Sequence, residues 1–218
     1  MSDHIPYTDE MDMEAQPGLP EPLPDGERLL WQGQPDTGLL ARHVFHVRKV
    51  GAYFGLLALW QLATGLHDGV AHTQVAINVG ILVLAAAVAI GLLWLLARAT
   101  AHEAVYSLTD QRLIMRIGVA FGMNFNIPFV RIQGASLRPL QKGFGDIALQ
   151  LEAGNKVSYA ILWPHARAWR LRAPEPTLRC IPEAEHVVRL MSTMLSGTSV
   201  DRPAVVVGDD LARAGVPV

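Results

Sequence analysis

Cysteine is almost absent from this chain, and basic residues are absent from its first part. Cys180 is the single cysteine among 218 residues, so no intrachain disulfide can form and the fold needs no oxidising compartment. Residues 1–27 hold eight acidic residues and no lysine or arginine. A secretory signal peptide begins with a basic region, so we expect no signal peptide here, and no lipidation motif is found.

Catalytic signatures are missing as well. The chain has no GxSxG, P-loop, HExxH, CxxC or Rossmann fingerprint, and its acidic residues form no obvious pair on one face. His43 and His46 are three residues apart and could share a ligand face, but two histidines without a third ligand are weak evidence for a metal. We therefore expect a protein that is not an enzyme and has no cofactor, no metal and no catalytic residue.

What the chain does have is a long apolar run at residues 75–97. It reads VAINVGILVLAAAVAIGLLWLLA, and Asn78 is its only strongly polar side chain. As a helix these residues would span about 34 Å, which covers a hydrocarbon core of about 30 Å. A buried helix of a soluble protein would show a polar stripe, and this run shows none. The run predicts a transmembrane helix.

A second, shorter apolar run at residues 50–66 favours a transmembrane hairpin. The connecting residues 67–74 contain no lysine or arginine, whereas Arg42, Arg48 and Lys49 precede the first span and Arg98 follows the second. The positive-inside rule then places both termini in the cytoplasm. Gly51 and Gly55 form a GxxxG pair that could allow close helix approach, although this pattern is common by chance.

The segments before the hairpin differ in composition. Residues 1–25 are acidic and proline-rich, and we interpret them as a tail without a core of its own. Residues 26–49 form a membrane-proximal interfacial segment. Within it, residues 29–31 are an apolar patch that fits either a strand or an interfacial segment, and residues 38–49 are predicted to form one interfacial helix.

After Arg98 the apolar pattern changes to a period of two, which predicts strands. The expected strands are 104–109, 112–117, 123–129, 133–138, 147–151, 157–161 and 177–181. An apolar stripe at helical spacing follows, made of Ala184, Val187, Val188, Met191, Met194 and Leu195. The predicted fold is an α+β membrane protein: a two-helix transmembrane hairpin (50–97), a small antiparallel β-barrel or sandwich capped by a C-terminal helix (103–195), and a tail (196–218).

The charge of the predicted β domain is modestly basic. Residues 98–195 hold twelve lysines and arginines against seven acidic residues, which suits anionic lipid headgroups or an ordinary solvated surface. Residues 163–172 combine two tryptophans with three arginines, the residue types that dominate interface hot spots. On a membrane-anchored protein such a loop favours lipid or protein contact over nucleic acid.

Several motifs resemble the bacterial pleckstrin-homology-like (PH-like) membrane domain. They are YSLTDQR at 106–112, Gly118, IPF at 127–129 and GDI at 145–147, and this resemblance covers residues 103–195. The segment GERLLWQGQP at 26–35 is similar to the one that precedes the membrane hairpin in such proteins. The resemblance implies a PH-like β domain.

Three further segments resemble the family of photosynthetic-complex assembly proteins of the PuhB type. They are ARHVFHVRK at 41–49, LWPHARAWRL at 162–171 and PEPTLRCIP at 174–182. The resemblance implies a non-catalytic factor that assembles the bacterial reaction centre and its core light-harvesting complex (LH1) at the inner, intracytoplasmic membrane of purple bacteria. The family supplies no catalytic residue to carry over.

The expected partners are reaction-centre or core antenna subunits and membrane lipids, with no nucleic acid, and a homo-oligomer is left open. The alternative is a membrane-tethered PH-like module that binds lipid or protein without any photosynthetic role. Either reading uses the same candidate contact residues, which are Trp163, His165, Arg167, Trp169, Arg170, Arg172, Arg42, His43, His46, Arg48 and Lys49.

Overall fold

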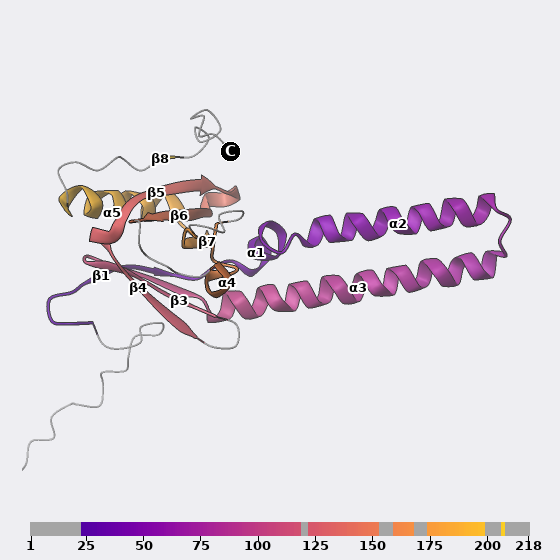
Figure 1. Ribbon diagram of the computed structural model, residues 1–218, viewed down its shortest axis with the longest axis horizontal. Helices are drawn as coiled ribbons and strands as arrows, with labels where there is room; N and C mark the ends of the chain where they lie inside the picture. The colour runs from indigo at the N-terminus through magenta and orange to yellow at the C-terminus, as the bar shows by residue number, and fades with distance from the viewer. Residues whose placement is uncertain (1–22, 119–121, 153–158, 168–173, 199–205, 208–218) are drawn as a thin grey trace, which may run out of the picture.

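The computed structural model describes residues 23–118, 122–152, 159–167, 174–198 and 206–207. A β domain lies at one end of the molecule, and a pair of long helices projects from it (Figure 1). Trp169, Arg170 and Arg172, together with most of both predicted tails, lie outside the described residues.

The first sheet contains four antiparallel strands in the order β1-β2-β3-β4. The strands are β1 (Leu29–Gly33), β2 (Val105–Thr109), β3 (Arg112–Ile117) and β4 (Met123–Pro128). Of the two readings of residues 29–31, the structure shows the strand, because β1 pairs with β2. Pro128 lacks a backbone N–H and lies in β4, an edge strand, as a proline in a sheet should.

The second sheet has the order β7-β6-β5-β8. It is built from β5 (Ile132–Pro139), β6 (Gly145–Leu151), β7 (Thr177–Ile181) and the short β8 (Val206–Val207). Helix α5 (Ala184–Thr198) packs on β5 and β6. The predicted apolar stripe does face the core, since Val187 and Met191 are fully buried. The strands thus form two sheets with one capping helix rather than a single closed barrel.

One predicted strand is wrong. Residues 157–161 were expected to pair with 147–151, but Tyr159–Leu162 forms a short helix, α4, and Val157 lies outside the described residues. Leu162 is fully buried in the main core, and its burial favours the helical turn over the strand that the alternating pattern predicts. The strand that pairs with β6 is instead β7.

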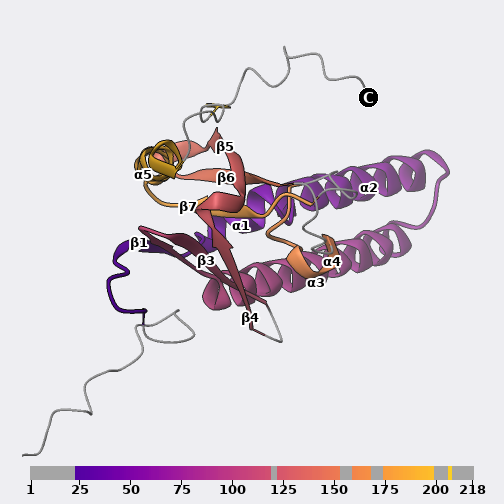
Figure 2. The same ribbon diagram turned by 60° about the vertical axis from the view of Figure 1, so that its left-hand side comes forward.

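Two antiparallel helices form the projection, α2 (Val47–His67) and α3 (His72–Glu103), and they pack along their length (Figures 1 and 2). Both exceed the predicted spans of 50–66 and 75–97. Among the described residues, α3 is the one helix that is long and apolar enough to cross a membrane. The helical pair is therefore present, whereas a second crossing by α2 is taken up below as a proposal.

The interfacial helix predicted for 38–49 is two elements instead of one. Helix α1 (Thr37–His43) ends at its cap Val44, and α2 starts anew after His46, whose φ of 53° is left-handed. The break allows Phe45 to turn into a second core cluster with Leu40, Ala97 and Cys180. Burial of one large apolar side chain thus outweighs the continuity of the helix.

Helix α1 is fixed to the β domain by Asp36. The Asp36 side chain caps the helix by accepting from the Leu39 N–H at 2.7 Å. Its own backbone N–H donates to the Cys180 carbonyl at 3.0 Å, which links α1 to β7. The sequence of residues 42–49 is thereby held against the edge of the second sheet, where the helical pair begins.

Candidate functional site

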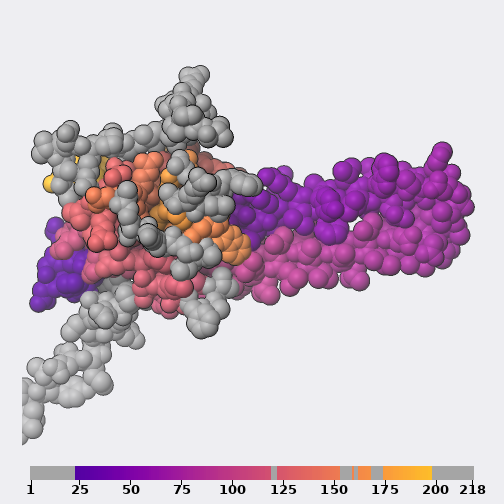
Figure 3. All heavy atoms as spheres, in the orientation of Figure 1, coloured from indigo at the N-terminus to yellow at the C-terminus, as the bar shows by residue number. Residues whose placement is uncertain are grey.

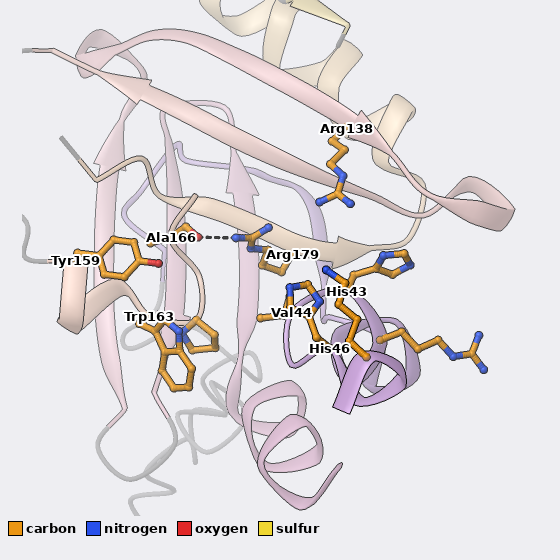
Figure 4. A pocket seen from close by; sticks show the side chains of 11 residues that line it. His43, Val44, His46, Arg138, Tyr159, Trp163, Ala166 and Arg179 are labelled. Carbon is orange, nitrogen blue, oxygen red and sulfur yellow. Dashed lines mark hydrogen bonds between the residues drawn. The ribbon is translucent and has the colours of Figure 1, made fainter. Parts of the chain in front are cut away.

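A cavity of about 710 Å³ lies where the helical pair meets the β domain. Figure 4 shows its lining side chains, which come from α1, the start of α2, β5, β7 and the segment around α4. A cavity of this size falls in the range of small-ligand sites. Its lining residues are Arg42, His43, Val44, His46, Lys49, Arg138, Tyr159, Trp163, Pro164, Ala166 and Arg179.

Four permanent cations line this cavity: Arg42, Lys49, Arg138 and Arg179. Among the described residues that line it none is acidic. Asp146 pairs with two of them, since its Oδ2 lies 3.1 Å from Nη1 of Arg179 and 3.6 Å from Nη1 of Arg138. Four cations facing one carboxylate leave the cavity strongly positive.

Asp146 itself holds the floor of the cavity together. An aspartate in the segment Lys142–Asp146 (KGFGD) is typical of a turn, but Asp146 lies in β6 and is buried. Its Oδ1 accepts from the Cys180 N–H at 2.8 Å while its Oδ2 binds Arg179, so one carboxylate joins β6 to β7. Arg179 also donates to the Ala166 carbonyl, which attaches the α4 segment to the same strand (Figure 4). Asp146 is thus a structural anchor of the site.

His43 faces the cavity as a neutral imidazole. Partial burial and then the Arg138 guanidinium are the main causes that lower the pKa of His43; Asp146 opposes them, and Arg42 and His46 add smaller lowering effects. Its ring therefore offers one donor and one acceptor near pH 7 rather than a further charge. Among the described residues, no group of three or more histidine, cysteine or acidic side chains is placed so that it could hold a metal ion.

Trp163 forms the aromatic wall of the site. It follows α4, precedes Pro164 through a cis peptide bond, and is 48% exposed. Its ring meets Phe45 edge to face with 5.8 Å between centroids. The Trp163 ring therefore lies at the surface beside the start of α2 and does not close the core.

His165 is placed differently from the other predicted contact residues. It is 1% exposed, and its Nδ1 lies 2.6 Å from the Tyr106 hydroxyl. Its backbone N–H binds the Leu162 carbonyl, and its own carbonyl accepts from Thr177 at 2.7 Å. Nη1 of Arg167 donates to the Glu175 carboxylate at 2.9 Å. His165 and Arg167 thus hold the Trp163 segment in position from inside the β domain, and neither residue lines the cavity.

The cavity brings together five of the predicted contact residues, namely Arg42, His43, His46, Lys49 and Trp163. Arg48 lies on the same turn of α2 as Lys49 and is exposed, but it does not line the cavity. Sequence reasoning missed Arg138, Tyr159 and Arg179. A signal for Arg179 did exist, because it is a charged residue in the middle of a strand whose other residues are buried.

Comparison with known proteins supports the fold. The family model described as Bacterial PH domain matches residues 56–195. A protein of Rhodobacter capsulatus named "Uncharacterized 23.7 kDa protein in puhA 5'region" is 46% identical over 193 residues, which cover 88% of each chain. No solved structure matches this chain. On this evidence the chain belongs to the bacterial PH domain family.

Proposed function

We propose that this protein is a non-catalytic, membrane-anchored assembly factor for the bacterial reaction centre and its LH1 antenna. Two observations support the proposal. The motifs at 41–49, 162–171 and 174–182 resemble the PuhB-type assembly family. The Rhodobacter capsulatus relative is named for the 5' region of puhA, which hints at a link to a photosynthesis operon.

We propose further that both helices cross the inner membrane, with both termini in the cytoplasm. Helix α2 has 21 residues, about 32 Å of helix, which matches a hydrocarbon core of about 30 Å. Large apolar side chains point outward from α2 (Leu56, Leu59 and Trp60) as well as from α3 (Leu84, Val88 and Leu92). On the face drawn in Figure 3 no other part of the protein covers the outer half of this helical pair. A bilayer would bury these side chains.

The observation that carries the proposed role is the position of Trp163. An aromatic ring that is 48% exposed, packed edge to face on Phe45 and lining the same cavity as four cationic side chains, has the character of an interface anchor. It lies where the helical pair begins, so a membrane subunit lying beside α2 and α3 would meet it. Trp169, Arg170 and Arg172, which belong to the same motif, are proposed to extend this contact.

The test is copurification and assembly in a purple phototroph. The full chain with an affinity tag is isolated from membranes in mild detergent, and mass spectrometry identifies the bound proteins. Recovery of reaction-centre or LH1 subunits is the expected result. Recovery of lipid alone, or of the chain as a homo-oligomer alone, would favour the alternative of a lipid- or protein-binding module without a photosynthetic role.

Variants make the test specific to the Trp163 segment. Trp163→Ala, and separately Trp169→Ala with Arg170→Ala, should lower the near-infrared absorbance of assembled core complex while the level of the variant protein stays normal. Met123→Ala is the matched control, because Met123 is an exposed apolar residue on β4 that does not line the cavity. Normal absorbance at a normal protein level would remove the segment from the mechanism.

A further inference from the structure

The basic cavity combines charge, size and position in a way that the assembly role does not require. Its four cations come from separate parts of the chain: α1, α2, β5 and β7. Holding like charges together costs free energy unless an anion offsets them. Among the described residues, neither Arg42 nor Lys49 has a carboxylate partner, so the charge at the mouth of the cavity is not neutralised from within.

The position of Lys49 indicates at which level of a membrane the cavity would lie. Lys49 lies in the first turn of α2, and the apolar surface of that helix starts directly after it. If α2 enters the bilayer, a lysine at this position lies among the headgroups, where long basic side chains are favoured. Trp163 and Phe45 meet at the same end of the helix, and aromatic rings favour the same layer.

The lining also offers neutral hydrogen-bonding groups. His43 stays uncharged beside the arginines, and Tyr159 brings a phenol to the opposite side of the cavity (Figure 4). A phosphate has several acceptor oxygens, which guanidinium, ammonium, phenol and imidazole donors can share. Asp146 pairs with Arg179 and more loosely with Arg138, so it offsets part of the charge of these two arginines but not that of Arg42 or Lys49.

We propose that this cavity binds the phosphate headgroup of an anionic phospholipid from the membrane leaflet that adjoins the β domain. The inference rests on the proposed membrane placement but not on the assembly role, and it assigns the cavity a ligand of its own. The headgroup phosphate lies among Arg42, Lys49, Arg138 and Arg179, of which Arg179 is the most buried, and the acyl chains run beside α2. A bound lipid would fix the β domain at a defined height on the membrane.

The experiment uses the full chain in nanodiscs of phosphatidylcholine with and without phosphatidylglycerol. Native mass spectrometry after release into neutral detergent measures which lipid stays bound. We expect retention of phosphatidylglycerol over phosphatidylcholine, and loss of about fivefold in this preference for each charge removed in Arg42→Gln and Lys49→Gln. Both side chains are exposed, so these substitutions leave the packed core intact.

Arg48→Gln is the matched control. It removes the same charge from the same helical turn, outside the cavity, so a general attraction to anionic membranes would weaken equally in Arg48→Gln and Lys49→Gln. Equal effects would overturn the proposal, as would equal retention of the two lipids by the unaltered protein.

A second arm separates a lipid from other anions. Inorganic phosphate and glycerol phosphate are added as competitors at the concentration of the phosphatidylglycerol. If either displaces the lipid completely at that concentration, the cavity is a site for soluble phosphate and the lipid assignment fails. If neither lipid nor phosphate binds while a copurified acidic protein segment does, the cavity is a protein-docking site and the proposal fails as well. Neither result would depend on whether the protein assembles photosynthetic complexes.

Discussion

The hydroxyl of Tyr106 and Nδ1 of His165 lie 2.6 Å apart inside the β domain, although 59 positions separate them in the chain. The backbone N–H of Arg179 donates to the same hydroxyl at 3.3 Å, and burial raises the pKa of Tyr106, so the phenol keeps its proton. A phenol that keeps its proton can donate it to Nδ1 of His165, an arrangement that requires the imidazole tautomer with its hydrogen on Nε2. The pair connects β2 to the segment that presents Trp163.

The first prediction concerns pH. Burial, with a smaller effect of Arg179, lowers the pKa of His165 to about 3 from its ordinary 6.5. Between pH 3 and pH 6.5 the imidazole of His165 is protonated in the unfolded chain but not in the folded chain. The unfolding free energy therefore falls as the pH falls below 6.5, by up to about 1.4 kcal/mol per pH unit. Chemical denaturation of the full chain in detergent at pH 5.0 to 7.5 should show this loss, and His165→Gln should flatten the profile between pH 5 and 6.5. An unchanged slope in this variant would mean that His165 is not buried as a neutral ring.

Tyr106→Phe isolates the hydrogen bonds of the same pair. The ring stays buried, but Nδ1 of His165 and the Arg179 N–H lose their partner, which should cost about 1–3 kcal/mol of unfolding free energy. Because the imidazole remains buried, the pH profile should keep the slope of the unaltered protein. A variant as stable as the parent would show that another group takes over the bond.

The second prediction concerns Glu27 and Arg112. Nε and Nη2 of Arg112 donate to the two carboxylate oxygens of Glu27, each at 2.8 Å, so the residues before β1 are tied to β3 by a bidentate pair. Burial would raise the pKa of Glu27, but the hydrogen bonds from Arg112 and Thr109 outweigh it and the pKa is lowered. The stability contributed by the pair is thus fully present above pH 4.5 and is lost as the pH falls through the lower, folded-state value.

Glu27→Gln should therefore destabilise the domain by about 1–3 kcal/mol at neutral pH and much less at acid pH. Hydrogen exchange of the β1 amides is the local measurement, because the loss should be largest there. Arg28→Gln is a suitable control, since Arg28 meets Asp110 through an exposed side chain and its pair should contribute little. Equal losses of unfolding free energy in the two variants would mean that the Glu27–Arg112 pair contributes no more than the exposed Arg28–Asp110 pair.

The third prediction locates the close approach of the two helices. A Cβ atom added at Gly65 would lie 2.7 Å from Cγ2 of Val75, whereas at Gly55 nothing lies within 4 Å. Gly65→Ala should therefore loosen the end of the helical pair, because Val75 is stiff at χ1 and cannot swing away. The measurement is the unfolding free energy of each variant in detergent. Gly55→Ala should be neutral or slightly stabilising.

The fourth prediction is topology. With both helices across the membrane, a reporter fused at Gly69 should lie on the periplasmic side and one at the C-terminus on the cytoplasmic side. Alkaline phosphatase and fluorescent-protein fusions give opposite signals on the two sides. Strong cytoplasmic activity at Gly69 would contradict the proposed transmembrane hairpin.

The sequence was most informative where one residue type has one physical meaning. A proline is typical of an edge strand or a strand end, and Pro128 has both positions in β4. The spacing of Val187 and Met191 predicts the buried face of α5, and this prediction is confirmed. Local patterns were weaker where a distant contact decides. Phe45 ends one helix and starts another because its partners, Ala97 and Cys180, are far along the chain.

The cavity could be predicted only in part for the same reason. Arg42 and Lys49 stand in one basic segment, so their joint role is visible in the sequence. Arg138 and Arg179 reach them only through the pairing of β5 with β6 and of β6 with β7. Asp146 looks like a turn residue until this pairing brings Arg179 and the Cys180 N–H to its carboxylate.

The position of β1 has a consequence for synthesis. Strands β1 and β2 are hydrogen-bonded neighbours, yet the whole helical pair lies between them in the chain. During translation β1 leaves the ribosome about seventy residues before the strand it pairs with, so the first sheet cannot close until both helices have emerged. If both helices cross the membrane as proposed, they would be inserted before the domain is complete, and pairing of β1 with β2 would then join the two ends of the helical pair.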